Sequence, residues 1–127
     1  MRPHSARPAL VIVSALALLA PSPLGADARL SMRVSPLTGL APATLVIDAV
    51  AERDPANRAL QIQVESADYF RSSLVQLDGD QAPRTTTIRY ENVPGGTYEV
   101  RVVLLGSNGK ERAATARPVE LFSAADR

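Results

Sequence analysis

Apolar and polar residues alternate along most of the chain after residue 28. The clearest example is the segment 60–65 (LQIQVE), in which every second side chain is apolar. A period of two is typical of a β-strand that buries one face and leaves the other in water. The same pattern, with varying clarity, predicts seven strands, at residues 30–34, 44–50, 60–65, 69–77, 84–90, 97–105 and 112–121.

Turn-forming residues separate these strands. Asn108 and Gly109 lie between the last two, and Asn-Gly is the strongest short signal for a β-hairpin. Pro118 interrupts the final strand, which favours a position at a sheet edge. No segment has the spacing of an amphipathic helix. Seven short strands in about 100 residues predict an all-β fold, a seven-stranded antiparallel sandwich of the immunoglobulin-like type.

The first 28 residues have the order of features that marks a secretory signal peptide. Arg2 and Arg7 give the start a positive charge, and residues 9–20 (ALVIVSALALLA) are small or apolar. Residues 26–28 (ADA) then supply the small side chains of a cleavage site. The apolar run is shorter than the about 20 residues that span a membrane, although a retained N-terminal anchor is the alternative.

This pattern divides the chain into three parts and places the middle one outside the cytoplasm. The predicted domain is therefore periplasmic or secreted, with no stable membrane insertion once the signal is cleaved. The parts are a signal peptide at residues 1–28, the sandwich domain at 29–122 and a frayed tail at 123–127.

Charge and composition exclude several functions for the predicted mature domain. The chain has 14 Lys and Arg and 13 Asp and Glu, so removing Arg2, Arg7 and Asp27 leaves 12 of each. A nucleic-acid-binding domain is expected to carry a basic excess, so we expect no nucleic-acid partner. The only histidine is His4, and the chain has no cysteine. Ser-His-Asp and Cys-His nucleophiles and metal sites built on imidazole or thiolate are therefore excluded, and we expect no enzymatic activity and no cofactor.

Two motifs give a resemblance to known families. Residues 93–100 (VPGGTYEV) resemble the corner of fibronectin type III and related immunoglobulin-like domains, where a Pro-Gly turn leads into a tyrosine. Residues 36–42 (PLTGLAP) resemble the entry to the second strand of PKD-like and other bacterial immunoglobulin-like domains. The resemblance implies structural roles for Pro94 and Gly95 in the turn and for Tyr98, whose hydroxyl would bond back to the backbone upstream.

Two short segments are candidates for binding. Asp78 and Asp80 flank a glycine and could offer oxygen ligands to calcium, although an ordinary turn has the same composition. Tyr69 and Phe70 are adjacent, so in a strand one of them faces outward and could mark a binding patch.

A third candidate is a charged face. Arg84, Arg89 and Arg101 fall on strands expected to be neighbours, and would form either an anion-binding face or ordinary cross-strand ion pairs with nearby glutamates.

These features favour a binding or structural module without catalysis, which contacts another protein of the cell envelope. One alternative is a carbohydrate- or small-ligand-binding module, against which the absence of tryptophan counts. A more remote alternative is a hydrolase that depends on a pair of carboxylates.

The predicted signal peptide can be tested by fusing residues 1–28 to a reporter that is active only after export. We expect the reporter to leave the cytoplasm, because the segment has the charged start, apolar run and small-residue site that the export machinery recognises. A passenger that stays in the cytoplasm would contradict this prediction. A fusion in which Leu18 and Leu19 are replaced by arginines is the control that should not be exported.

Overall fold

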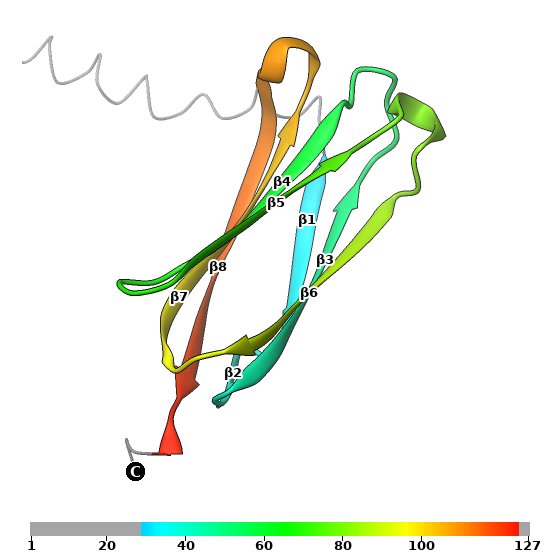
Figure 1. Cartoon of the computed structure of the whole chain (residues 1–127). Coiled ribbons are helices and arrows are strands. Elements are labelled where there is room, and N and C mark those ends of the chain that lie inside the picture. The colour runs from blue at the N-terminus through cyan, green and yellow to red at the C-terminus, as the bar shows by residue number, and fades with distance from the viewer. Residues whose placement is uncertain (1–28, 125–127) are drawn as a thin grey trace, which may run out of the picture.

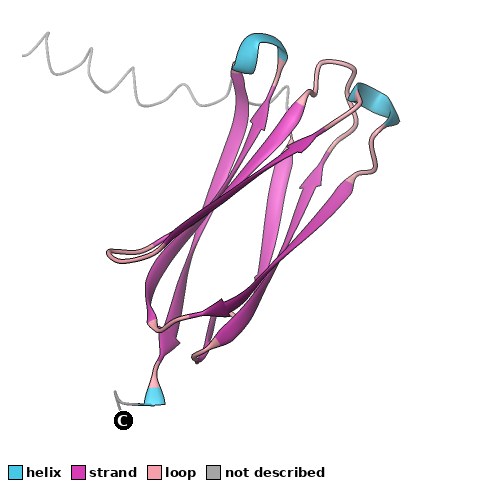
Figure 2. Cartoon of the chain, viewed as in Figure 1, coloured by secondary structure: helices cyan, strands magenta, loops and turns pink. Residues whose placement is uncertain are grey.

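Eight β-strands make up the part of the chain that the computed structural model describes, residues 29–124 (Figure 1). Short 3-10 turns occur at Gly79–Gln81 and Ser107–Gly109, and strands and loops form nearly all of the rest (Figure 2). Within residues 29–124, no helix is long and apolar enough to cross a membrane. The strands are β1 (Leu30–Ser35), β2 (Thr38–Leu40), β3 (Ala43–Ala51), β4 (Ala59–Glu65), β5 (Phe70–Gln76), β6 (Thr85–Val93), β7 (Gly96–Leu105) and β8 (Glu111–Phe122).

The strands form two sheets that pack face to face (Figure 1). One sheet has the order β1-β3-β6 and the other the order β2-β8-β7-β4-β5. All neighbouring strands run antiparallel except β2 and β8, which are parallel. This arrangement is a sandwich of two β-sheets, so the predicted all-β sandwich is confirmed.

The predicted number of seven strands is wrong, because β2 lies between the first two predicted strands, in a segment where no strand was predicted. Its three residues stand between Pro36 and Pro42, and three residues are too few to show an alternating pattern. Its partner is the far end of the chain, where Thr38 pairs with Glu120 and Leu40 with Phe122. Neither fact is visible in the local sequence.

The structure describes the predicted domain but not the predicted signal peptide. Residues 1–28, the predicted signal peptide, lie outside the described residues, as do residues 125–127 of the predicted tail. The last strand ends at Phe122, and Ser123 and Ala124 follow it.

The core lies between the two sheets and follows the alternating pattern of the sequence. In β4 the residues Leu60, Ile62 and Val64 are at most 1% exposed, whereas the side chain of Glu65 is exposed. They face β3, whose inward residues are also fully buried. Replacing Leu60 or Ile62 by alanine is expected to lower the free energy of unfolding by about 2 to 5 kcal/mol, because the cavity adds to the lost transfer energy.

Strand β8 forms an open sheet edge for most of its length. It pairs with β7 throughout, but β2 covers it only from Glu120 to Phe122. The N–H of Glu120 donates to the carbonyl of Leu37 (2.9 Å), away from β7, and residues two apart point the same way. An N–H at position 118 would therefore point to the open edge. Because Pro118 has no N–H, the open edge has one donor fewer, and the β7–β8 ladder loses no hydrogen bond.

The hairpin between β7 and β8 turns at Asn108 and Gly109. Both have positive φ angles, 61° and 71°, and the N–H of Lys110 donates to the carbonyl of Ser107 (3.3 Å). Two successive left-handed residues define a type I′ turn, whose twist matches that of the strands it joins.

Tyr98 joins the start of β7 to the turn before it. Its hydroxyl donates to the carbonyl oxygen of Pro94 (2.6 Å), and its ring is 2% exposed. Burial raises the pKa of the Tyr98 hydroxyl, so the neutral form that can donate is favoured. Gly95 fits beside the end of β8, since a Cβ there would come within 3.1 Å of the backbone nitrogen of Ser123.

Replacing Tyr98 by phenylalanine tests the contribution of this hydroxyl. The substitution keeps the buried ring and removes one hydrogen bond, so we expect the free energy of unfolding to fall by about 1 to 2 kcal/mol. Chemical denaturation of residues 29–127 measures the change.

Thr97→Val is a suitable control, because the Thr97 hydroxyl donates to the exposed carboxylate of Glu120 (2.9 Å). It should change the free energy of unfolding by no more than about 0.5 kcal/mol. If Tyr98→Phe destabilises no more than this control, the hydroxyl does not fasten the corner.

Candidate binding surface

The adjacent aromatic residues Tyr69 and Phe70 point in opposite directions at the start of β5. Phe70 faces outward and is 56% exposed, whereas Tyr69 turns inward and meets the ring of Tyr98 edge-on, with centroids 5.6 Å apart. The hydroxyl of Tyr69 is buried and has no hydrogen-bond partner among residues 29–124. Leu74, also on the outer face of β5, is 58% exposed. The outward aromatic is therefore Phe70, and it stands with a second large apolar side chain.

Strand β5 is the last strand of its sheet, with β4 as its one neighbour. Two backbone hydrogen bonds at the ends of β4 and β5 show which residues face each other. The N–H of Leu77 donates to the carbonyl of Arg58 (2.9 Å), and the N–H of Ser66 donates to the carbonyl of Tyr69 (2.8 Å). The odd-numbered residues from 69 to 77 thus turn their backbone groups toward β4. By alternation, the backbone groups of the even-numbered residues point to the open side. We call these four residues the β5 edge: Phe70, Ser72, Leu74 and Gln76.

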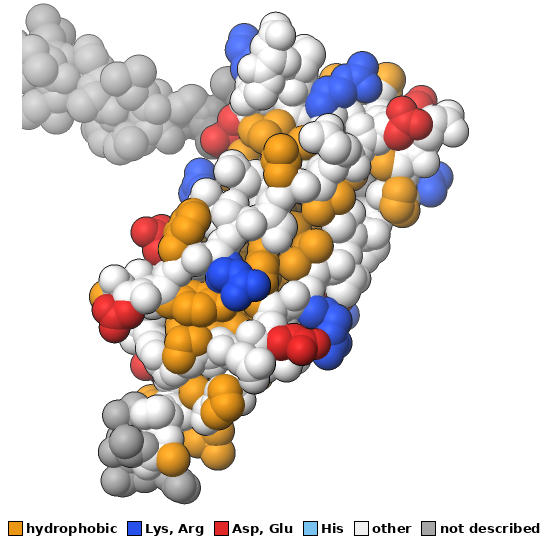
Figure 3. All heavy atoms as spheres, viewed as in Figure 1, with side chains coloured by type: hydrophobic (Ala, Val, Ile, Leu, Met, Phe, Trp, Pro, Cys, Tyr) orange, Lys and Arg blue, Asp and Glu red, His pale blue; other side chains and the backbone are white. Residues whose placement is uncertain are grey.

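Side chains of β5 and β6, the edge strands of opposite sheets, meet at the side of the sandwich. Ser73 Oγ lies 2.6 Å from the hydroxyl of Tyr90, and the guanidinium of Arg71 lies 5.6 Å from the centre of the Tyr90 ring. Val75 and Ile88 are half-buried beside these contacts. Figure 3 shows apolar side chains gathered in a band between the two strands. Apolar surface therefore continues from β5 toward β6.

Asp78 and Asp80 form a tight turn with both side chains exposed. Gly79 has a φ of +56°, and the N–H of Gln81 donates to the carbonyl of Asp78 (2.9 Å). A Cβ at Gly79 would come within 3.1 Å of the carbonyl oxygen of Pro55, so glycine is needed for close packing as well. No group of three or more acidic residues that could hold a metal ion occurs in residues 29–124.

The expectation that Arg84, Arg89 and Arg101 lie on neighbouring strands is wrong. Arg89 is in β6 and Arg101 in β7, which belong to different sheets. The turn at Pro94 carries the chain from one sheet to the other, so consecutive strands in sequence do not pair here. Arg101 instead lies 4.0 Å from Glu111 in an exposed ion pair, which is ordinary surface.

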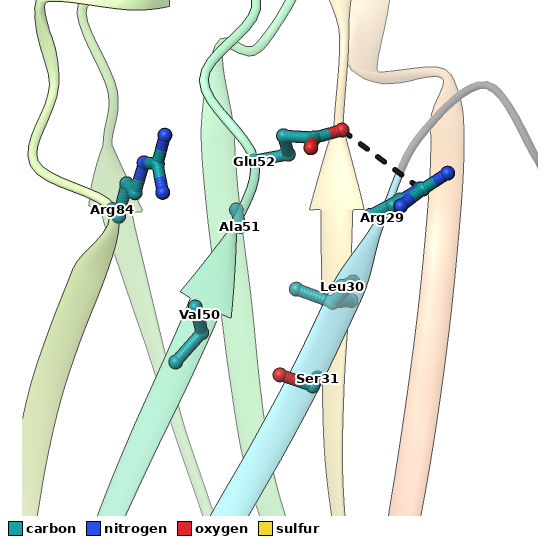
Figure 4. Close-up of a pocket in the computed structure, with 7 residues that line it drawn as sticks. All are labelled: Arg29, Leu30, Ser31, Val50, Ala51, Glu52 and Arg84. Carbon is teal, nitrogen blue, oxygen red and sulfur yellow. Dashed lines mark ion pairs between the residues drawn. The ribbon is translucent and has the colours of Figure 1, made fainter.

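Arg84 borders a shallow depression of about 330 Å³ at one end of the three-stranded sheet (Figure 4). Figure 4 shows Arg84 on one side of Glu52 and Arg29 on the other. Arg29 Nε lies 3.9 Å from Glu52 Oε1, and both side chains are more than half exposed. Water screens charges in such a place, so the depression offers weak attraction to a ligand.

One polar cluster was not predicted from the sequence. Asn57 is 2% exposed, donates to the carbonyl of Glu52 (3.0 Å) and accepts from Arg112, which also lies 3.5 Å from Asp54. These contacts join the β3–β4 loop to β8, where burial makes full hydrogen bonding necessary. Asn57 sits in a polar segment that looks like any exposed turn, so the sequence carries no signal for its burial.

Two solved structures are similar to the chain. A family 76 glycoside hydrolase from Bacteroides thetaiotaomicron is similar with a TM-score of 0.53 and 16% identity. The similarity covers 76% of this chain and 21% of the hydrolase, so the chain spans about a fifth of that protein. A CARDB domain from Pyrococcus furiosus, in complex with di-metal ions, has a TM-score of 0.45 and 12% identity over 76% of this chain and 94% of its own. No family model and no curated protein sequence matches the chain.

The acidic turn can be tested with calcium. We expect the melting temperature of residues 29–127 to be the same in calcium as in a chelator, because two exposed carboxylates fall well short of the about six oxygens that calcium needs. Differential scanning fluorimetry measures this. A calcium-dependent rise in the melting temperature that Asp80→Asn abolishes would contradict the prediction.

Proposed function

We propose that this chain is an exported, non-catalytic immunoglobulin-like module that contacts another protein of the cell envelope through the β5 edge. The observation that carries the proposal is the pairing of Phe70 and Leu74, each more than half exposed, on a strand whose outer backbone groups are open. Large apolar side chains beside an unpaired strand are features of surfaces that bind other proteins.

A binding role also agrees with the chemistry that the sequence offers. Beyond residue 28 the chain has neither histidine nor cysteine, the side chains that most often act as base or nucleophile near neutral pH. The carboxylates that remain lie on exposed turns and strands such as those of Asp78 and Asp80. We therefore propose that the domain does not catalyse a reaction.

Within the immunoglobulin-like group, we propose a fibronectin type III-like subtype. The bond from Tyr98 to Pro94 has the form of the tyrosine corner of those domains. In addition, β5 pairs with β4, whereas a constant-type immunoglobulin sheet would place this strand beside β6.

A carbohydrate-binding module is the second candidate. It is favoured by the similarity to part of a glycoside hydrolase. Phe70 would then be the ring on which a sugar stacks. An exposed phenylalanine lacks the polar groups that usually orient a sugar, so we rank this function below protein contact.

The proposal predicts that the mature domain captures an envelope protein and that the β5 edge is required. Tagged residues 29–127 are crosslinked in the envelope of the producing cell, and the captured proteins are identified by mass spectrometry. We expect capture of the partner by the double variant Phe70→Ser, Leu74→Ser to fall about tenfold or more, since a few central residues carry most of the binding energy of an interface.

Leu40→Ser is the matched control, because Leu40 is 62% exposed and lies on β2, far along the sheet from β5. It should keep the partner. Equal capture by the wild type and the double variant would overturn the assignment to β5. Retention on immobilised polysaccharide that Phe70→Ser abolishes would instead support the sugar-binding function.

A further inference from the structure

We infer that two copies of this domain pair through β5, antiparallel and centred on Ser72, so that two five-stranded sheets become one continuous sheet. The inference rests on the proposed function in one respect, since it uses the same edge for protein contact. It goes further by naming a second copy of the chain as an occupant of that edge and by fixing the register.

The open backbone groups of β5 select which residues can pair. Phe70, Ser72, Leu74 and Gln76 present their N–H and C=O groups to the open side. An added antiparallel strand forms hydrogen bonds at such positions only, so an even-numbered residue must face an even-numbered residue. Pairing centred on Ser72 meets this condition, because Ser72 faces Ser72 and Phe70 faces Leu74 of the second copy. Each of these pairs exchanges two hydrogen bonds.

The same register brings together the two exposed apolar side chains. Phe70 and Leu74 both project from the outer face of the sheet, at 56% and 58% exposure. In the paired strands each Phe70 lies directly opposite Leu74 of the other copy, on one face and within contact distance. The two-fold symmetry therefore buries both Phe70–Leu74 pairs at once. Each copy supplies the neighbouring strand that β5 of the other copy lacks.

Charge favours the register centred on Ser72 over the registers centred one residue to either side. Centring the pair on residue 71 would place Arg71 opposite Arg71, and like charges directly opposite each other destabilise a sheet. Centring it on residue 73 would place Asp68 opposite Asp78, and both of these carboxylates are exposed. Centring on Ser72 sets Arg71 opposite Ser73 and Asp68 opposite Gln76, so no like charges face each other.

The other edge of the same sheet lacks these properties. In β8, Pro118 removes an outward donor and β2 already covers the end of the strand. Arg112 and Arg117 flank the remaining open segment, and charged residues and proline are the usual means of preventing edge-to-edge pairing. Strand β5 has no proline and a single charged residue, Arg71. The second copy is therefore expected at β5.

Single-cysteine variants of residues 29–127 test the pairing, since the natural chain has no cysteine. In the inferred register the Cα atoms of the two Ser72 residues are about 5.5 Å apart, a separation that suits a disulfide. We expect purified Ser72→Cys to form a disulfide-linked dimer under mild oxidation about tenfold or more faster than two controls. A short thiol-reactive crosslinker provides a second measurement that does not depend on disulfide geometry.

The controls are Gln76→Cys and Ala116→Cys. Gln76 is on the same edge, but the two copies of it would be ~27 Å apart in the inferred register. Ala116 is exposed on the open part of β8. Adding Leu74→Lys to Ser72→Cys should return its rate to that of the controls, because the apolar pair is lost.

Three results would overturn the inference: equal rates for Ser72→Cys and both controls, fastest linkage through Ala116→Cys, or fastest linkage through Gln76→Cys. This experiment uses the purified domain alone, whereas the proposed function is tested by capture of a different envelope protein. Failure of self-pairing with capture intact would leave the proposed function in place, and loss of capture with self-pairing intact would overturn only the proposed function.

Discussion

The packing of two apolar sheet faces against each other is the interaction on which this structure depends. The chain has no cysteine, so no disulfide joins the sheets. Leu60, Ile62 and Val64 on one side and Leu45 and Ile47 on the other are almost fully excluded from water. Burial at this level contributes about 1.5 to 3 kcal/mol for each large side chain. A domain of about 100 residues has little surplus stability, so local devices such as the Tyr98 hydrogen bond carry weight.

The alternating pattern determines which face of each strand is buried, and it was sufficient to predict the sandwich. It carries no information about which sheet a strand joins. That is why Arg89 and Arg101 were expected to be neighbours, although the turn at Pro94 places β6 and β7 in different sheets. The pattern also requires several residues, so the three-residue strand β2 was missed. Its pairing with Glu120 to Phe122 depends on contacts between distant parts of the chain.

The candidate surface was only partly predictable for a related reason. Period two indicated that one of Tyr69 and Phe70 faces outward, and the structure identifies Phe70. It could not indicate that Leu74 stands nearby with an open strand, because an edge is a property of the assembled sheet. The burial of Asn57 was hidden in the same way, since its hydrogen bonds to Glu52 and Arg112 cross between separate segments.

The short parallel pairing of β2 with β8 has a mechanical consequence. The start of β1 and the end of β8 lie at opposite ends of the sandwich (Figure 1), so a pull applied at these two points acts along the strands. The hydrogen bonds between Thr38–Leu40 and the last residues of β8, and those between β1 and β3, would then be loaded in shear and share the force. Bonds loaded together resist more force than bonds that open one after another, as at the end of a hairpin. A pull along the strands therefore meets more resistance than the same pull applied across them.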